Sequence, residues 1–302
     1  MYGIAFQAMG CHMEALLDSD DLQAAYALNA VAAQFAAWEQ SFSRFRCDSE
    51  LSLLNQKRQG VVSEDLWQVL QAACGMARFS TGLVTPLAGK AVRQAGYAQS
   101  FVAGWDIDAP EENVTVADWQ AILFDAKRRH VTLPPEADLD LGGMAKGWCA
   151  HKAVEDLGRF APALVDAGGD IAVSGALRDG SAWEVALGRR EDKPTAFLFL
   201  DQGAVATSGR DVRHWRKNGR LHHHIIDPRT GQPAQSDVMR ATVVAEHAVL
   251  AEAAAKVILI QGSSAGLAWA TQQGLAACVW SEQGWQSNDV FAAGGFRQPV
   301  LL

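Results

Sequence analysis

Three consecutive histidines, residues 222–224, stand directly before a predicted turn. Ile225 and Ile226 favour a strand, and Pro228 and Gly231 then supply turn chemistry. Side chains alternate along a strand, so imidazoles are expected on both of its faces. A neutral imidazole can accept a proton near neutral pH, as a general base must. A metal-scavenging or merely exposed histidine run explains the pattern equally well, because a base is recognised by geometry.

Residues 141–147, Leu-Gly-Gly-Met-Ala-Lys-Gly, form a glycine-rich segment that leads into a predicted helix. Backbone N–H groups at such a helix start can approach an anion, and Lys146 would add a cation at the same end. The alternative is tight packing of the loop against a sheet. The segment matches none of the glycine motifs that we associate with phosphate binding. Residues 166–170, Asp-Ala-Gly-Gly-Asp, and residues 206–209, Ala-Thr-Ser-Gly, could likewise face a ligand or only shape turns.

Periodic apolar residues predict the elements that would hold these segments. Helical spacing is found over residues 21–42 and 63–80, where the apolar stripe is expected to face the core. Shorter helices are predicted over 88–95, from the 141–147 glycines to residue 157, and over 249–260 and 265–272. Strands are predicted over 4–17 with an interruption at 8–11, and over 121–124, 130–133, 163–166, 171–174, 183–187, 196–200, 204–208, 241–245 and 276–280. Because helices and strands mix without a regular βαβ alternation, the predicted fold class is α+β.

Composition places the chain among ordinary globular proteins. It has 302 residues, 49% of them hydrophobic and 20% charged, enough for one large domain or two intimate ones. The net charge of −8 argues against nucleic acid as a main partner. Five cysteines without a CxxC pair suit reduced thiols, and neither a signal peptide nor a membrane-spanning run is recognisable. A cytoplasmic protein is therefore expected.

Six segments, in this order, resemble the ApbE family of FAD:protein FMN transferases. They are Ala8-Met9-Gly10, residues 42–55 with Phe-Ser-Arg-Phe and Ser-Glu-Leu-Ser-Leu-Leu-Asn, residues 140–147, 165–170 and 206–209, and His-Ile-Ile-Asp-Pro-Arg-Thr-Gly at 224–231. The resemblance implies an ApbE-like, T-fold-related α+β fold, in which mixed sheets and packed helices form one compact two-lobed unit. Residues 1–302 would then be a single catalytic and flavin-binding domain.

The resemblance also implies an activity and a site. The family moves the FMN half of FAD onto a threonine or serine hydroxyl of an acceptor flavoprotein, and AMP leaves. His224 matches the proposed base, and the backbone carbonyl of Ala145 would bind a magnesium ion. FAD contacts are implied for Met9, Asn55, Gly143, Gly168, Gly169, Asp170, Thr207 and Ser208. Lys146 is expected to join them as the cation at the start of the helix.

The chain departs from the family pattern where the other magnesium ligands are expected. Family members usually carry Ala-Asp-Ala-Leu-Ala-Thr at the start of a late helix, whereas residues 251–256 read Ala-Glu-Ala-Ala-Ala-Lys. Glu252 can still reach a metal, since carboxylate oxygens suit magnesium, but the charged ammonium of Lys256 has donors only. The two residues are either an ordinary i,i+4 ion pair on a solvated helix face, or Lys256 partly takes the place of the metal beside the pyrophosphate.

This departure leaves two further functions open beside the transferase. One is a metal-independent FAD-binding protein with weak or no transferase activity. The other is an FAD pyrophosphatase, in which water takes the place of the acceptor hydroxyl. Smaller departures from the family pattern, which bear on the chemistry more than on the fold, are Cys11, Thr85 and His151.

Overall fold

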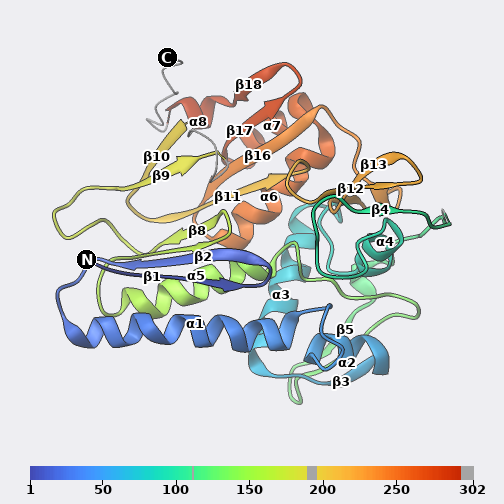
Figure 1. The fold of residues 1–302 in the computed structure, drawn as a ribbon, viewed down its shortest axis with the longest axis horizontal. Helices are drawn as coiled ribbons and strands as arrows, with labels where there is room; N and C mark the ends of the chain where they lie inside the picture. The colour runs from blue at the N-terminus through green and yellow to red at the C-terminus, as the bar shows by residue number, and fades with distance from the viewer. Residues whose placement is uncertain (111, 189–195, 294–302) are drawn as a thin grey trace.

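The fold is built on an antiparallel sheet. The computed structural model describes residues 1–110, 112–188 and 196–293, and within these residues the sheet has eight strands (Figure 1). Their order is β1-β2-β7-β8-β11-β16-β17-β18, with every neighbouring pair antiparallel. The strands are β1 (Tyr2–Ala8), β2 (Cys11–Leu17), β7 (Ala163–Ala167), β8 (Asp170–Val173), β11 (Gly203–Gly209), β16 (Val238–Ala245), β17 (Ala276–Ser281) and β18 (Gly284–Ser287).

Three helices pack side by side against this sheet. Helix α1 (Leu22–Phe42) contacts β1 and β2, α5 (Ala145–Gly158) contacts β7 and β8, and α6 (Ala248–Gln261) contacts β11 and β16. The Asp21 side chain caps α1 by accepting the Gln23 N–H at 2.9 Å. A short helix, α7 (Ser263–Gln272), follows α6 and packs against β17. Within the described ranges, no helix is long and apolar enough to cross a membrane.

A hairpin of β9 (Trp183–Leu187) and β10 (Ala196–Leu200) makes a second apolar cluster with the sheet. Residues of β9 alternate between buried and exposed, as a strand with one covered face requires. Its buried side chains pack with Leu164, Val173 and Val205 from β7, β8 and β11. The short helix α8 (Asp289–Ala293) adds Phe291 to the same cluster.

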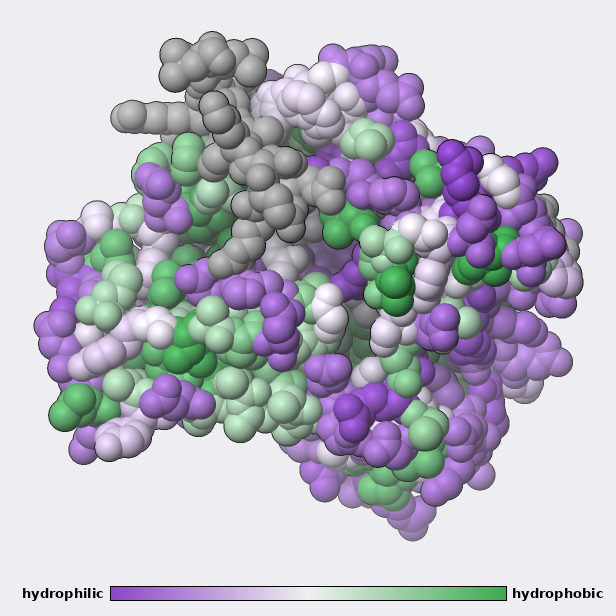
Figure 2. All heavy atoms as spheres, in the orientation of Figure 1, coloured by the Kyte–Doolittle hydropathy of each residue, from purple (hydrophilic) through white to green (hydrophobic). Residues whose placement is uncertain are grey.

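The remaining elements form a second lobe, on the right in Figure 1. It contains α2 (Glu50–Lys57), α3 (Glu64–Phe79), α4 (Gly89–Gln94), the 3₁₀ turn η1 (Trp119–Ala121), and small sheets. The strands of those sheets are β3 (Gln59–Val61), β6 (His130–Thr132) and β5 (Leu123–Asp125); β13 (Arg220–His223), β12 (His214–Lys217) and β4 (Asp106–Ile107); and β14 (Ile226–Asp227) with β15 (Gln232–Pro233). Figure 2 shows this lobe as mostly hydrophilic, whereas apolar surface gathers over β1, β2 and α1.

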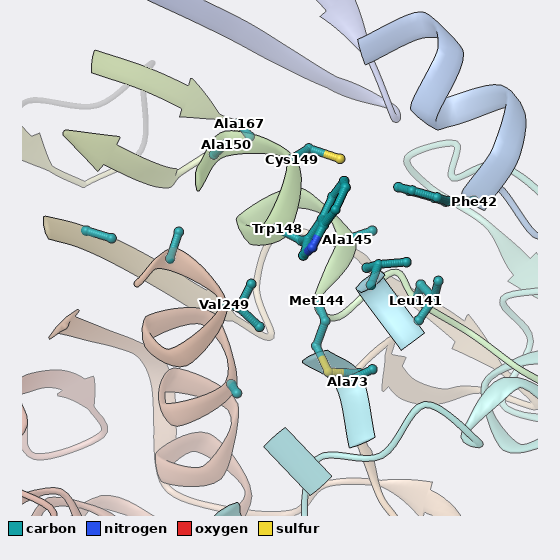
Figure 3. Packing of buried hydrophobic residues seen from close by; sticks show 14 of the residues in the cluster. Phe42, Ala73, Leu141, Met144, Ala145, Trp148, Cys149, Ala150, Ala167 and Val249 are labelled. Atoms are coloured by element: carbon teal, nitrogen blue, oxygen red, sulfur yellow. The ribbon is translucent and has the colours of Figure 1, made fainter. Parts of the chain in front are cut away.

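The start of α5 is anchored by an aromatic cluster in the main core. Trp148 meets Trp38 and Phe42 of α1 edge-on, with ring centroids 5.5 and 5.7 Å apart. Figure 3 shows the Trp148 and Phe42 rings near Met144 and Leu141, which are each 1% exposed. Edge-to-face pairs of this kind contribute about 0.5–1.5 kcal/mol each beyond the area they bury. The first turn of α5, which carries Lys146, is therefore held rigidly against α1.

The α+β class is confirmed, and the predicted helices and strands are found within a few residues of their expected bounds. One expectation is wrong. Residues 4–17 are two strands, β1 and β2, that pair in register from Tyr2 opposite Leu17 to Ala8 opposite Cys11. Met9 and Gly10 form the two-residue turn with φ of 50° and 68°, which matches the twist of a hairpin. The interruption seen in the sequence is therefore a tight turn.

Candidate functional site

A cavity of about 410 Å³ lies where the two lobes meet. Its wall includes the β1–β2 turn, the end of α1, the glycine-rich segment 140–146, and residues 224–226. Lys256 and Ile260 add a stripe from α6, and Arg213 comes from the loop before β12. Segments far apart in the chain thus bring the predicted residues Met9, Gly143, Ala145, Lys146, His224 and Lys256 to one cavity wall.

Four charged side chains form a buried network beside the cavity, the lysine–carboxylate cluster of Lys146, Asp170, Glu252 and Lys256. The Lys146 ammonium contacts Asp170 Oδ2 and lies 3.4 Å from Glu252 Oε1. Lys256 Nζ donates to the same Oε1 at 3.1 Å, and the Gly147 N–H donates to Glu252 Oε2 at 3.0 Å. Glu252 and Asp170 are each 1% exposed. The interpretation of Glu252 and Lys256 as a pair on a solvated helix face is therefore wrong.

Two glycines of the 141–147 segment are explained by close packing against α6. A Cβ on Gly143 would lie 3.0 Å from Lys256 Cε, and one on Gly147 would lie 2.8 Å from Glu252 Oε2 and 2.9 Å from the Ala248 carbonyl. The glycines therefore let α5 and the turn before it approach α6. Tight packing is what the sequence offered as the alternative to anion binding, but the partner is a helix rather than a sheet.

Burial and charge act against each other inside the cluster. Burial lowers the pKa of Lys146, but the carboxylates of Asp170 and Glu252 outweigh it and raise that pKa above its ordinary value. Burial raises the pKa of Glu252, but Lys146, Lys256 and the Gly147 N–H together lower it below its ordinary value. Burial and the nearby Glu252 charge raise the pKa of Asp170 to about 6. At neutral pH the cluster therefore holds two cations and two anions.

His224 is a neutral imidazole with a defined tautomer. Its Nδ1 lies 3.3 Å from the Arg213 carbonyl, so Nδ1 carries the proton that is donated to this oxygen. Burial lowers the pKa of His224 well below its ordinary value, and the charges of Arg213 and Lys256 lower it further. The other ring nitrogen, Nε2, therefore keeps a lone pair that can accept a proton.

The two preceding histidines are buried, not exposed. His223 donates from Nε2 to the Ala234 carbonyl at 2.9 Å and accepts the Ile225 N–H on Nδ1 at 3.3 Å. Burial lowers the pKa of His223 to about 4. His222 is 8% exposed. An exposed histidine run is therefore wrong, and His223 has a structural role between β13 and the segment before β16.

Arg44 and Asp140 form a second ion pair on the cavity wall. Arg44 Nε lies 2.8 Å from Asp140 Oδ2, and Asp140 Oδ1 accepts the Gly142 N–H at 2.7 Å. The guanidinium stacks on Phe45 and Tyr97, 4.1 and 4.7 Å from the ring centroids. The Arg44 side chain is 6% exposed, yet its Nη2 has no hydrogen-bond partner among the described residues. It can therefore donate to a molecule in the cavity.

The other predicted contacts lie behind the cavity wall. Asn55 uses its amide on the Leu139 backbone, donating to the carbonyl at 3.0 Å and accepting the N–H at 2.8 Å. It therefore fixes the strand-like segment that leads into the glycine turn. The Gly169 carbonyl accepts the Thr207 N–H at 3.2 Å, which joins the β7–β8 turn to β11. The Gly168-Gly169 turn borders the lysine–carboxylate cluster, because it leads directly into Asp170. Ser208 is buried in β11, opposite Ala241 of β16.

Several cavity residues were not predicted. Arg44 and Asp140 lie inside segments that carry the resemblance, so their charges offered a signal that was passed over. Arg213 donates from Nη2 to Cys11 Sγ at 3.0 Å, and Tyr97 faces the His224 ring edge-on at 6.4 Å. Neither position has a sequence signal, because the contacts join segments more than 100 residues apart.

Comparison with known proteins identifies the family of this chain. The profile of the ApbE family matches residues 9–279, most of the chain. The chain belongs to the ApbE family. The FAD:protein FMN transferase of Treponema pallidum is 32% identical over 247 residues, which cover 74% of this chain and 68% of that protein. The FAD:protein FMN transferase of Haemophilus influenzae is 27% identical over 260 residues, covering 78% of this chain and 72% of that protein.

Solved ApbE structures share the fold of this ApbE-family chain. The ApbE protein from Thermotoga maritima superposes with a TM-score of 0.87 at 23% identity, covering 98% of this chain and 99% of the other. The flavinyl transferase ApbE from Pseudomonas stutzeri, in its apo form, gives a TM-score of 0.82 at 19% identity, with 98% of each chain covered. At these identities the likeness establishes the fold.

The predicted magnesium ligands do not fit a divalent cation in this arrangement. Glu252 Oε1 already faces two ammonium groups, and Oε2 accepts the Gly147 N–H. Magnesium needs several oxygens near 2.1 Å in an octahedron, and a neighbouring ammonium repels it. Among the residues that the structure describes, no group of three or more His, Cys, Asp or Glu side chains could hold a metal. Ligation by Ala145 and Glu252 stays a prediction of the resemblance.

Proposed function

We propose that this ApbE-family protein is an FAD:protein FMN transferase. It would move FMN from FAD onto a threonine or serine hydroxyl of an acceptor flavoprotein and release AMP. The observation that carries the proposal is the meeting of a neutral, oriented imidazole, His224, with the cationic side chain of Lys256 on one cavity wall. Phosphoryl transfer requires a proton acceptor for the attacking hydroxyl and positive charge beside the phosphates.

The proposed reaction exchanges one P–O bond for another. The acceptor hydroxyl oxygen bonds to the phosphorus on the FMN side of the pyrophosphate, and the bond from that phosphorus to the bridging oxygen breaks. The bridging oxygen leaves with AMP. The hydroxyl proton passes to Nε2 of His224, whose Nδ1–H stays on the Arg213 carbonyl. This hydrogen bond fixes the ring orientation, so Arg213 positions the base through its backbone.

The cavity offers two environments to FAD. Phe45, Tyr97 and the stacked Arg44 guanidinium form an aromatic, largely apolar wall with one buried donor, which suits a heteroaromatic ring. Lys146, Lys256 and the Gly143 turn form a polar end, which suits the phosphates. We propose direct FAD contacts for Met9, Gly143 and Lys146. Supporting positions behind them are Asn55, Gly168, Gly169, Asp170, Thr207 and Ser208.

The proposed location is the cytoplasm. All five cysteines are free thiols, and Cys149 and Cys278 are buried. Burial raises the pKa of both thiols above the ordinary value, which keeps them protonated and unreactive. A reducing compartment suits such a set. The acceptor would be a flavoprotein present in that compartment.

Three functions are separated by one incubation. The protein is mixed with FAD and an acceptor that carries an Asp-x-x-(Thr/Ser)-Gly-(Ala/Ser)-Thr site, with and without added magnesium, and the products are read by mass spectrometry. Acceptor mass raised by one FMN group, with AMP released, is the expected result. AMP and FMN without acceptor labelling would instead indicate a pyrophosphatase. FAD left intact on the protein after gel filtration would indicate a binding protein.

The base is tested by His224→Ala. This variant should lose transfer while it still binds FAD, because the imidazole takes a proton without holding the phosphates. His214→Ala is the matched control, since His214 is an exposed histidine of the neighbouring strand β12. Full transfer by His224→Ala would remove His224 from the mechanism.

A further inference from the structure

Three largely buried cationic side chains on the cavity wall are paired with carboxylates, and these three are not equally available to a phosphate. Arg44 is paired with Asp140 at 2.8 Å. Lys146 is held between the carboxylates of Asp170 and Glu252. Lys256 shares one carboxylate oxygen, Glu252 Oε1, with Lys146. Among these three, Lys256 is the one that has no carboxylate of its own, because it shares its only carboxylate partner with Lys146.

The donors of Lys256 can be counted. An ammonium has three N–H donors. One reaches Glu252 Oε1 at 3.1 Å, and a second is directed to the Glu252 backbone carbonyl at 3.4 Å. The third is left for the cavity, which Lys256 lines. Its stem lies against Gly143, where a Cβ would come within 3.0 Å of Cε, so the ammonium is held over the glycine turn.

We propose that Lys256, positioned by Glu252, neutralises the FAD pyrophosphate in place of a divalent metal. The inference rests on the proposed FAD:protein FMN transferase function and deepens it. Lys256 donates a hydrogen bond to a non-bridging pyrophosphate oxygen and keeps its proton throughout, while the hydroxyl proton goes to His224. Glu252 is a positioning residue: the Gly147 N–H fixes its Oε2, and its Oε1 fixes Lys256.

The cluster balances its own charge until the dinucleotide arrives. Its two lysines and two carboxylates sum to zero, so the pyrophosphate adds uncompensated negative charge next to the Lys256 side chain, which is 14% exposed. A hydrogen bond between ionised partners is worth about 1.5–3 kcal/mol, which corresponds to about tenfold to a hundredfold in affinity. Lys256 should therefore account for a change of that size in FAD binding.

The first test needs no variant. The full-length protein is freed of metal with a chelator, and its FAD affinity is measured by titration calorimetry with chelator and then with millimolar magnesium. Binding that changes less than about twofold supports the proposal, because the ammonium already supplies the charge. FAD binding that is lost in chelator and restored by magnesium overturns it.

The second test removes the ammonium. Lys256→Met keeps the length of the stem and should weaken FAD binding by about tenfold to a hundredfold, with a native circular dichroism spectrum. Lys127→Met, at an exposed lysine in the turn between β5 and β6, is the matched control. Unchanged FAD affinity in Lys256→Met overturns the proposal, and the first test decides the matter if this variant does not fold.

The third test restores the residues that the family resemblance implies. Glu252→Asp combined with Lys256→Thr removes the ammonium and offers a carboxylate and a hydroxyl from one helix face. Magnesium should then strengthen FAD binding by about tenfold or more, unlike in the parent protein. No effect of magnesium on this double variant would count against the exchange of metal for lysine.

The outcomes separate this inference from the proposed function. Transfer that occurs only with magnesium keeps the function and overturns the role of Lys256. Metal-independent FAD binding that depends on Lys256, without transfer to any acceptor, keeps the role of Lys256 and overturns the transferase. Absence of FAD binding under every condition overturns both.

Discussion

Replacing Glu252 by glutamine should destabilise the folded protein, because Glu252 joins three donors in a buried place. Its carboxylate faces Lys146, Lys256 and the Gly147 N–H at 3.0–3.4 Å, and the residue is 1% exposed. Removing one partner of a buried ion pair costs about 3–5 kcal/mol, since a charge is left uncompensated. Glutamine keeps the volume and one acceptor oxygen, so the loss should be near the lower value, about 3 kcal/mol.

The loss can be expressed as a change in melting temperature. An unfolding entropy of about 2.1 cal/mol/K per residue gives about 0.6 kcal/mol/K for a chain of 302 residues. A loss of about 3 kcal/mol then lowers the Tm by about 5 °C. Differential scanning calorimetry at pH 7, with denaturant unfolding as a second measure, would determine it.

The control and the double variant make this prediction sharp. Glu136→Gln removes an exposed partner of Lys90, whose Nζ lies 3.4 Å away, and should change stability by less than about 1 kcal/mol. Glu252→Gln combined with Lys256→Met should be more stable than Glu252→Gln alone, because the unpaired ammonium is gone. Equal melting temperatures for Glu252→Gln and Glu136→Gln would refute the reasoning.

Three further predictions concern His224, His223 and the Gly168-Gly169 turn. The acid limb of the transfer rate should lie below pH 6.5, because the pKa of His224 is lowered; a rate that already falls between pH 8 and 7 would contradict this. The pKa of His223 is about 4 in the folded protein and about 6.5 when unfolded, so its stabilisation of the fold is complete above pH 6.5 and lost as the pH falls toward 4. This loss is about 3 kcal/mol, and His223→Gln should lack that part of the pH dependence in denaturant unfolding. Gly168→Ala should lower the melting temperature more than Gly169→Ala does. Both glycines have a positive φ, of 71° and 96°, but only at Gly168 would an added Cβ collide with a neighbour, 2.7 Å from Cys11 Cβ. Equal losses of stability in the two variants would show that this collision does not matter.

Local patterns predicted most elements, and distant contacts account for what was missed. The stripe over residues 21–42 was enough to predict α1, because helical periodicity is local. The short strands β12 and β13 depend on pairing with each other and with β4, which lies more than 100 residues earlier. No window of sequence contains that pairing, so β12 was not predicted, and for β13 the sequence indicated only an extended segment from His222 onward.

The candidate site divides in the same way. Six predicted residues line one cavity, and their positions could be predicted because the ordered segments match those of the ApbE family. The burial of Glu252 was not readable from the sequence, because a Glu and a Lys four residues apart on a helix suit solvent equally well. The carboxylate is buried because α5 packs closely against α6 at Gly147, whose N–H donates to Glu252.

The contact between Gly143 and Lys256 limits how this protein can change over evolutionary time. A single methyl group at residue 143 would press on the lysine stem at 3.0 Å, and one at residue 147 would press on the carboxylate that holds the lysine. The turn and the helix therefore cannot vary separately. A lineage could replace Lys256 by a shorter residue and then tolerate alanine at residue 143, but the reverse order would pass through a poorly fitting intermediate.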